Sequence, residues 1–88
     1  MKIKNGFVVK NVGDHNYVVA TGELTQTFRS MIRLNGTGRF LWDLLAKDVT
    51  IDELARAMTE KYDVSAEDAR RDVEAFVTAL SKNGILEE

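Results

Sequence analysis

The 88-residue sequence contains no cysteine, a single histidine and no long apolar segment. Without cysteine there are no disulfides, no thiolate ligands for zinc or iron–sulfur clusters and no thiol nucleophile. No run approaches the roughly 18–20 apolar residues that a membrane span requires, and the start, MKIKNGFVVK, lacks the apolar stretch of a secretory signal. The sequence therefore predicts a cytoplasmic protein whose fold depends on packing alone.

Length and composition predict one domain over residues 1–88. Apolar residues make up 44% and charged residues 30%, as in an ordinary globular domain. The charge is uneven: residues 1–49 carry seven Lys/Arg and four Asp/Glu, whereas residues 50–88 carry five and ten. This asymmetry fits either a solvated surface or a basic half that attracts an acidic partner.

No arrangement of side chains in the sequence indicates catalysis. His15 lies beside Asp14 in a predicted turn, where a solvated role is expected, since a functional histidine needs a base, a metal or a cavity. Helix capping and solubility explain the following carboxylates of the second and third predicted helices: Asp52, Glu53, Glu67, Asp68, Asp72 and Glu74. The sequence therefore predicts no enzyme, no metal site and no cofactor.

The first third of the chain reads as strands. Phe7–Val12 and Tyr17–Ala20 are rich in β-branched and aromatic residues, and Gly13–Asn16 between them favours a turn, so a hairpin is expected. The polar connection Thr21–Ser30 holds a single bulky aromatic residue, Phe28.

A third strand is predicted at Met31–Leu34. Alternation places Ile32 and Leu34 on one face and Met31 and Arg33 on the other. The following Asn-Gly-Thr-Gly lacks the lysine and the length of a phosphate-binding loop, so we interpret it as a turn and a helix start.

Three helices are predicted after this strand. Asn35 or Thr37 caps the first, Thr50–Glu53 forms a capping box for the second, and Ser65 caps the third, which Gly84 ends. Trp42 belongs either to the core or to an anchor for a partner. Apolar residues recur at helical spacing at Phe40, Leu41, Leu44 and Leu45, at Leu54, Ala55, Met58 and Tyr62, and at Ala69, Val73, Phe76, Val77 and Leu80.

The resulting order, β-β-β-α-α-α, predicts an α+β fold in which a three-stranded antiparallel sheet precedes three helices in a winged-helix-like outline. Such an outline invites a DNA-binding role. However, the second and third helices lie in the acidic half, where Arg70 and Arg71 stand beside Asp68 and Asp72. A surface that reads DNA would be repelled by phosphate there.

The order of several short motifs resembles that of the PqqD family, named for a small protein of pyrroloquinoline quinone synthesis. These motifs are the strand running into L-N-x-T-G, the L-W-x-L-L helix, the K-Y-D-V link, the D-V-x-x-F-V-x-x-L helix and the terminal G-I-L. The segment VVATGELTQTF before the third strand is similar as well. Together they cover nearly the whole chain.

The resemblance implies a peptide-binding module. Members of the family recognise the leader part of ribosomally made precursor peptides and hold the precursor for a modifying enzyme, often a radical S-adenosylmethionine protein. The leader adds as a strand beside the third strand and against the third helix, and this chain would be a standalone version. The residues expected to bind the peptide are Met31, Ile32, Arg33, Leu34, Arg70, Val73, Glu74 and Val77.

Alternative functions stay open at the level of sequence. One is a winged-helix transcription regulator, and another is an adaptor that binds the modifying enzyme only. An exposed edge strand can also pair with a second copy, so a homodimer is possible. If the leader is acidic, Arg33, Arg70 and Arg71 are expected to line one groove and attract it.

Overall fold

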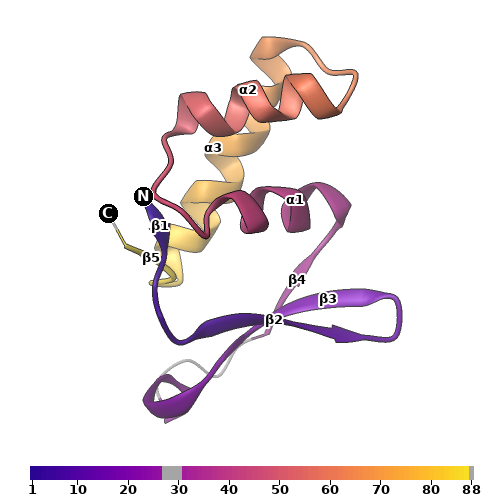
Figure 1. The fold of residues 1–88 in the computed structure, drawn as a ribbon. Helices are drawn as coiled ribbons and strands as arrows, with labels where there is room; N and C mark the ends of the chain where they lie inside the picture. The colour runs from indigo at the N-terminus through magenta and orange to yellow at the C-terminus, as the bar shows by residue number, and fades with distance from the viewer. Residues whose placement is uncertain (27–30, 88) are drawn as a thin grey trace.

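The computed structural model describes residues 1–26 and 31–87 (Figure 1). Its elements are β1 (Lys2–Ile3), β2 (Phe7–Val12), β3 (His15–Ala20), the 3-10 helix η1 (Gly22–Gln26), β4 (Ile32–Leu34), α1 (Gly36–Leu44), α2 (Ile51–Lys61), α3 (Ala66–Lys82) and β5 (Leu86–Glu87). The predicted α+β fold, with a three-stranded antiparallel sheet followed by three helices, is confirmed. Phe28 lies outside the described residues.

The main sheet has the order β2-β3-β4, and both pairs are antiparallel. Val12 pairs with His15, so the hairpin turn contains only two residues, and the predicted four-residue turn is wrong. Gly13 has a φ of +63° and Asp14 a negative φ, which is the pattern of a type II′ turn. His15 is therefore the exposed first residue of β3 rather than part of the turn.

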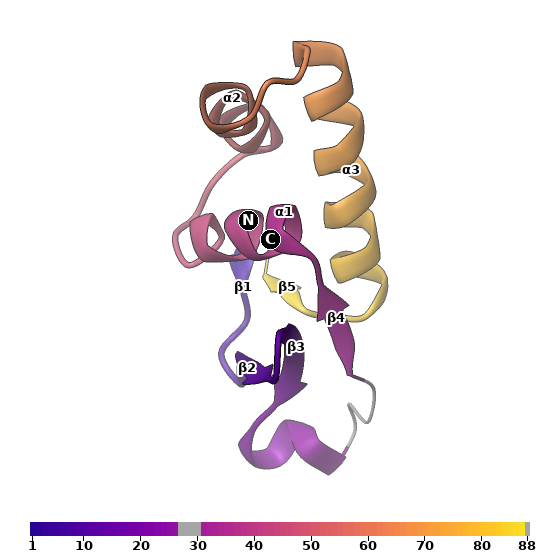
Figure 2. The same ribbon diagram turned by 90° about the vertical axis from the view of Figure 1, so that its right-hand side faces the viewer.

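A second, two-stranded sheet that the sequence did not predict joins the ends of the described chain. Lys2 pairs with Glu87 and Ile3 with Leu86, so that β1 and β5 lie side by side (Figure 2). The N-terminal ammonium donates to the carboxylate of Asp48, and this hydrogen bond, with the attraction of the two charges, lowers the pKa of Asp48. These contacts fix the start of the chain beside the loop between α1 and α2.

The predicted helix starts are confirmed. The Asn35 side chain, rather than that of Thr37, accepts from the Gly38 N–H at 2.7 Å. The capping box of α2 is complete, because the Glu53 N–H donates to Thr50 Oγ1 (3.1 Å) and the Thr50 N–H donates to Glu53 Oε1 (3.0 Å). Ser65 caps α3 in the same way.

The end of α3 is a Schellman motif. Gly84 has a φ of +70°, its N–H donates to the Ser81 carbonyl, and the Ile85 N–H donates to the Leu80 carbonyl, both at 3.0 Å. This reversal returns the chain toward the core, where Ile85 is completely buried.

Replacing Thr50 by alanine should destabilise the domain by about 1 kcal/mol, because the amide of Glu53 loses its acceptor. For a domain of this size that corresponds to a fall in Tm of about 4–8 °C, measurable by circular dichroism. Thr78→Ala, an exposed threonine within α3, is the matched control and should leave Tm unchanged or slightly higher. Equal melting of the two variants would contradict a stabilising role for the capping box.

The core lies between the inner face of the main sheet and the three helices. Trp42 is only 8% exposed, so it completes this core and does not serve as an exposed anchor. Tyr62 and Phe76, which the sequence placed on the buried stripes, are only partly buried. The buried apolar residues of the core are Phe7, Val18, Leu34, Leu41, Trp42, Leu45, Leu54, Ala55, Met58, Ala69, Val73, Val77, Leu80, Ile85 and Leu86.

Candidate peptide-binding site

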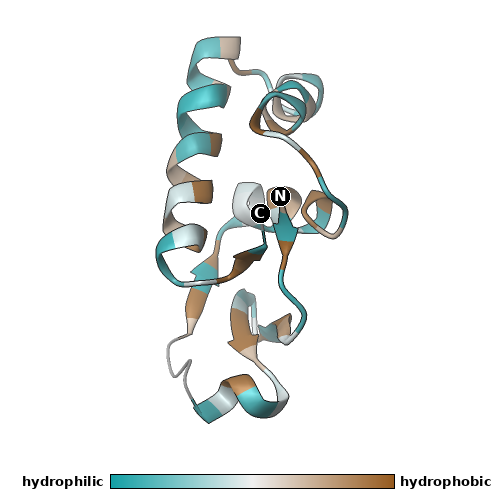
Figure 3. Ribbon diagram, turned by 90° about the vertical axis from the view of Figure 1, so that its left-hand side faces the viewer, coloured by the Kyte–Doolittle hydropathy of each residue, from teal (hydrophilic) through white to brown (hydrophobic). Residues whose placement is uncertain are grey.

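Strand β4 has one face toward the core and the other toward solvent, as predicted. Leu34 is buried and Ile32 partly buried, whereas Arg33 is exposed and Met31, just before the strand, is 58% exposed. Figure 3 shows this alternation along β4 as apolar, polar and apolar segments. The side chains of Ile32 and Leu34 thus hold the strand in place.

The register of the sheet determines which backbone groups of β4 face outward. The Thr21 N–H donates to the Gly6 carbonyl at 2.7 Å, which makes this a hydrogen-bonded pair of the β2–β3 ladder. Because such pairs alternate, the odd-numbered residues of β3 bond to β2 and the even-numbered ones to β4. Their partners in β4 are Ile32 and Leu34. The N–H and C=O of Arg33 therefore point to the outer edge, where the described residues place no further strand.

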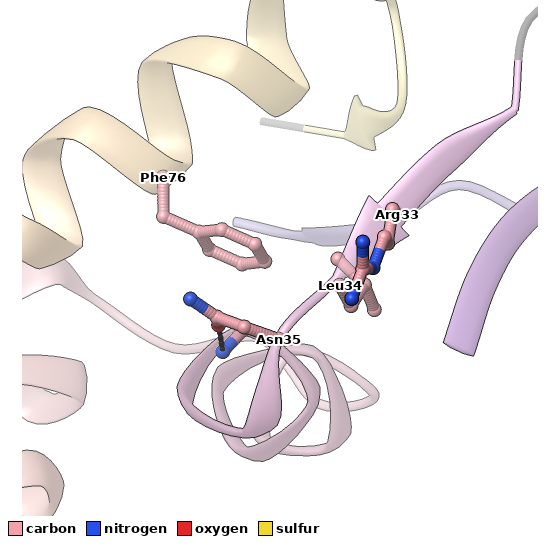
Figure 4. A pocket seen from close by; sticks show the side chains of 5 residues that line it. Arg33, Leu34, Asn35 and Phe76 are labelled. Carbon is pink, nitrogen blue, oxygen red and sulfur yellow. Dashed lines mark hydrogen bonds between the residues drawn. The ribbon is translucent and has the colours of Figure 1, made fainter. Parts of the chain in front are cut away.

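Two adjoining hollows lie beside this edge, between α3 and the junction of β4 with α1. The first, of about 290 Å³, is lined by Arg33, Leu34, Asn35, Gly38 and Phe76 (Figure 4). The second, of about 330 Å³, is lined by Asn35, Thr37, Gly38, Leu41, Asp72, Ala75 and Phe76. Because three residues are common to both, we treat the two hollows as one feature, the α3–β4 groove.

Two of the shared residues determine the shape of the groove. The ring of Phe76 projects from α3 toward the junction of β4 and α1 (Figure 4). Opposite it, Gly38 leaves room for the ring: a Cβ atom at this position would lie 3.4 Å from Phe76 Cε1 and 3.5 Å from Leu34 Cδ2. The glycine of the Thr-Gly motif thus forms the base of the groove.

Gly38→Ala should weaken peptide binding several-fold, since the added methyl group would occupy the base of the groove. A gain in helix propensity of up to about 1 kcal/mol opposes the crowding of Asn35 Oδ1, 3.2 Å from the new Cβ, so Tm should change by only a few degrees. Gly36→Ala is the matched control, because a Cβ there meets no atom within 4 Å. Isothermal titration calorimetry that finds equal affinities for the two variants would contradict this position for the guest.

The structure brings only part of the predicted site together. Met31, Ile32, Arg33 and Leu34 lie in or next to the edge strand as expected. On α3, however, Val73 is completely buried and Val77 is 8% exposed, so both belong to the core beneath the groove. A bound peptide would not reach Val73 without a rearrangement of this core.

Arg70 and Glu74 lie on a different flank of α3. Arg70 donates to Asp52 of α2 and, at 3.0 Å, to Glu74. The hydrogen bond and charge of Asp52, followed by those of Glu74, raise the pKa of Arg70. The expectation that Arg33 and Arg70 line one groove is wrong, because Arg70 faces a separate hollow that includes Asp52 and Arg56.

Sequence reasoning missed the α3 residues that do line the groove. The sequence pattern places Phe76 on the apolar stripe and Asp72 on a solvated face, whereas in the structure the two lie one turn apart on the flank toward β4. Their i, i+4 spacing is visible in the sequence. The sequence does not show which flank of α3 faces β4.

Within residues 1–26 and 31–87, no three or more His, Cys, Asp or Glu residues are grouped so that they could hold a metal ion. In the same part of the chain, every helix is too short or too polar to span a bilayer.

The sequence profile of the family described as "Coenzyme PQQ synthesis protein D (PqqD)" matches residues 20–86. The chain belongs to the PqqD family. The matched region of this PqqD-family protein runs from the end of β3 into β5, so it includes both walls of the α3–β4 groove. No curated protein sequence matches the chain.

Two solved structures are similar to this PqqD-family protein over 99% of its length. One is described as "TbiB1 in Complex with the TbiA(beta) Leader Peptide", with a TM-score of 0.79, 26% identity and 95% of that chain covered. The other is "Lasso peptide synthetase B1 complexed with the leader peptide", with a TM-score of 0.76, 22% identity and 96% covered. At 22% identity the second supports the fold alone.

Proposed function

We propose that this PqqD-family protein binds the leader segment of a ribosomally made precursor peptide as an added strand on β4 and presents the precursor to a modifying enzyme. The observation that carries the proposal is the outward-facing backbone of Arg33 beside a groove lined by Phe76. The similar structure at 26% identity, a complex with a leader peptide, supports it.

The two parts of the site supply different components of binding. An extended peptide that pairs with Arg33 gains main-chain hydrogen bonds worth about 0.5–1.5 kcal/mol each, with little demand on its sequence. An apolar side chain placed against Phe76 and Gly38 adds about 1.5–3 kcal/mol if it is fully buried. Met31, exposed next to the strand, offers a flexible apolar contact at the edge. Specificity therefore depends on the groove.

In this proposal the chain performs no reaction itself, and a separate enzyme carries out the modification in the cytoplasm. The family resemblance points to a radical S-adenosylmethionine enzyme as that partner. Binding at the edge of β4 leaves most of the precursor outside the α3–β4 groove, where an enzyme can reach it. A second copy of the chain would compete with the leader if it paired with the same edge.

The proposal is tested with synthetic peptides that cover the short reading frames encoded beside the gene for this chain. Titration followed by 15N–1H correlation spectra should show saturable binding, with the largest shifts at Arg33, Gly38 and Phe76. Scrambled versions of the same peptides are the control and should bind more weakly. Shifts confined to the side of α3 that faces α2, or no binding by any peptide, would contradict the proposal.

A DNA-binding role is examined in the same series. Two basic residues of α3, Arg70 and Arg71, are already neutralised, since Arg70 pairs with Asp52 and Glu74, and Arg71 pairs with Asp68. Titration with an unspecific duplex of about 20 base pairs at low salt should therefore give no binding, whereas a DNA-binding domain binds detectably under these conditions.

A further inference from the structure

The two ends of the α3–β4 groove carry opposite charges. Arg33 lines the first hollow but not the second, and Asp72 lines the second but not the first. The residues shared by both hollows, Asn35, Gly38 and Phe76, lie between them and carry no charge. The groove thus runs from a cation, past an aromatic ring, to a carboxylate.

These two charges are also unsatisfied within the described part of the chain. Neither Arg33 nor Asp72 forms an ion pair with any described residue. Two other carboxylates on α3 do form ion pairs: Glu74 pairs with Arg70, and Asp68 pairs with Arg71. The pairing along α3 therefore leaves Asp72 as an uncompensated carboxylate at the wall of the groove.

On the basis of the proposed function, we infer that the guest is an extended segment in which a bulky apolar residue has a basic residue on one side and an acidic residue on the other. The apolar side chain would pack on Phe76 and Gly38. The acidic side chain would face Arg33, and the basic one would face Asp72.

The N-terminus of α1 also borders the second hollow. Whereas Asp72 favours a cation in this hollow, the helix N-terminus favours an anion. Its macrodipole corresponds to about half a positive charge, and one of its free N–H groups, that of Gly38, already donates to Asn35 Oδ1. Asp72 contributes a full negative charge. The only arginine on α1, Arg39, is paired with Asp43 at 3.0 Å. The net preference in this hollow is therefore for a cation.

The expected contribution of each charge is moderate. Both side chains are exposed, and an exposed ion pair changes affinity by about two- to five-fold. The apolar contact determines whether a peptide binds, and the charges determine which of several apolar peptides is preferred and in which direction it lies.

Selection from a phage-displayed library of random 12-residue peptides tests this inference. Peptides selected by the wild-type protein should carry an apolar residue with Lys or Arg on one side and Asp or Glu on the other. Selection by Asp72→Lys should replace the basic residue by an acidic one, and Arg33→Glu should replace the acidic residue by a basic one. Glu60→Lys and Lys10→Glu, which make equivalent changes at exposed positions outside the groove, should select the wild-type pattern.

The outcomes separate this inference from the proposed function. Peptides that share an apolar residue but show no charge preference, or the same preference in all four variants, would overturn the inference and leave strand addition intact. Failure of the wild-type protein to enrich any peptide, together with unchanged spectra at Arg33 and Phe76, would overturn both.

Discussion

Truncation of Phe76 to alanine should remove most of the peptide affinity while the domain stays folded. The ring lines both hollows of the α3–β4 groove, and aromatic residues at the centre of a binding site typically contribute 2 kcal/mol or more, which is roughly a 30-fold change in affinity. A fully buried phenylalanine would cost about 3–5 kcal/mol of stability on truncation. Phe76 is only partly buried, so we expect a cost of about 1–2 kcal/mol.

Leu80→Ala is the stability reference for this prediction. Leu80 lies one turn further along α3, is 1% exposed and lines neither hollow of the groove, so its truncation should cost about 2–5 kcal/mol. Affinity is measured by titration calorimetry and stability by thermal denaturation. The prediction fails if Phe76→Ala binds like wild type, or if it melts as low as Leu80→Ala.

Arg33→Pro should abolish peptide binding with only a small loss of stability. Proline removes the one outward-facing N–H of β4, and its ring occupies the edge along which a guest strand would lie. The bonds from β4 to β3 are made by Ile32 and Leu34, so they are retained, and proline is tolerated on an edge strand when its missing N–H faces solvent. We expect affinity to fall more than ten-fold.

Two further variants distinguish the effect of the backbone N–H on affinity from the effect of the arginine side chain. Arg33→Ala removes the charge but keeps the N–H, so it should lose only about two- to five-fold in affinity. Ile32→Pro removes a bond to β3 and should destabilise the fold. If Arg33→Pro binds as tightly as Arg33→Ala, the edge of β4 is not the docking strand.

The features that sequence predicted best are those determined by neighbouring residues. Asn35, Thr50 and Ser65 cap their helices because each side chain reaches an N–H only three residues away. The alternation of core-facing and solvent-facing side chains along β4 likewise depends only on adjacent residues. By contrast, β1 and β5 contain two residues each and pair across almost the entire chain, so no local pattern marks them.

The errors at the candidate site have a common cause. Helical spacing correctly identified the apolar stripe of α3, but it did not specify which neighbour covers each flank. Arg70 lies toward α2 and Phe76 toward β4, and this difference depends on how three elements pack together. Which backbone groups of β4 are free is likewise decided by the two-residue turn at Gly13, since one more turn residue would change the register.

The shortness of β4 also affects how long a bound peptide stays in place. With three residues, of which one directs its backbone outward, the strand provides few main-chain bonds to a guest. For a dissociation constant of about 1 µM and an association rate constant of about 10⁶ M⁻¹s⁻¹, a complex lasts about 1 s. Such a lifetime permits repeated exchange, so that one copy of the protein can deliver many precursors in turn without any input of energy to release them.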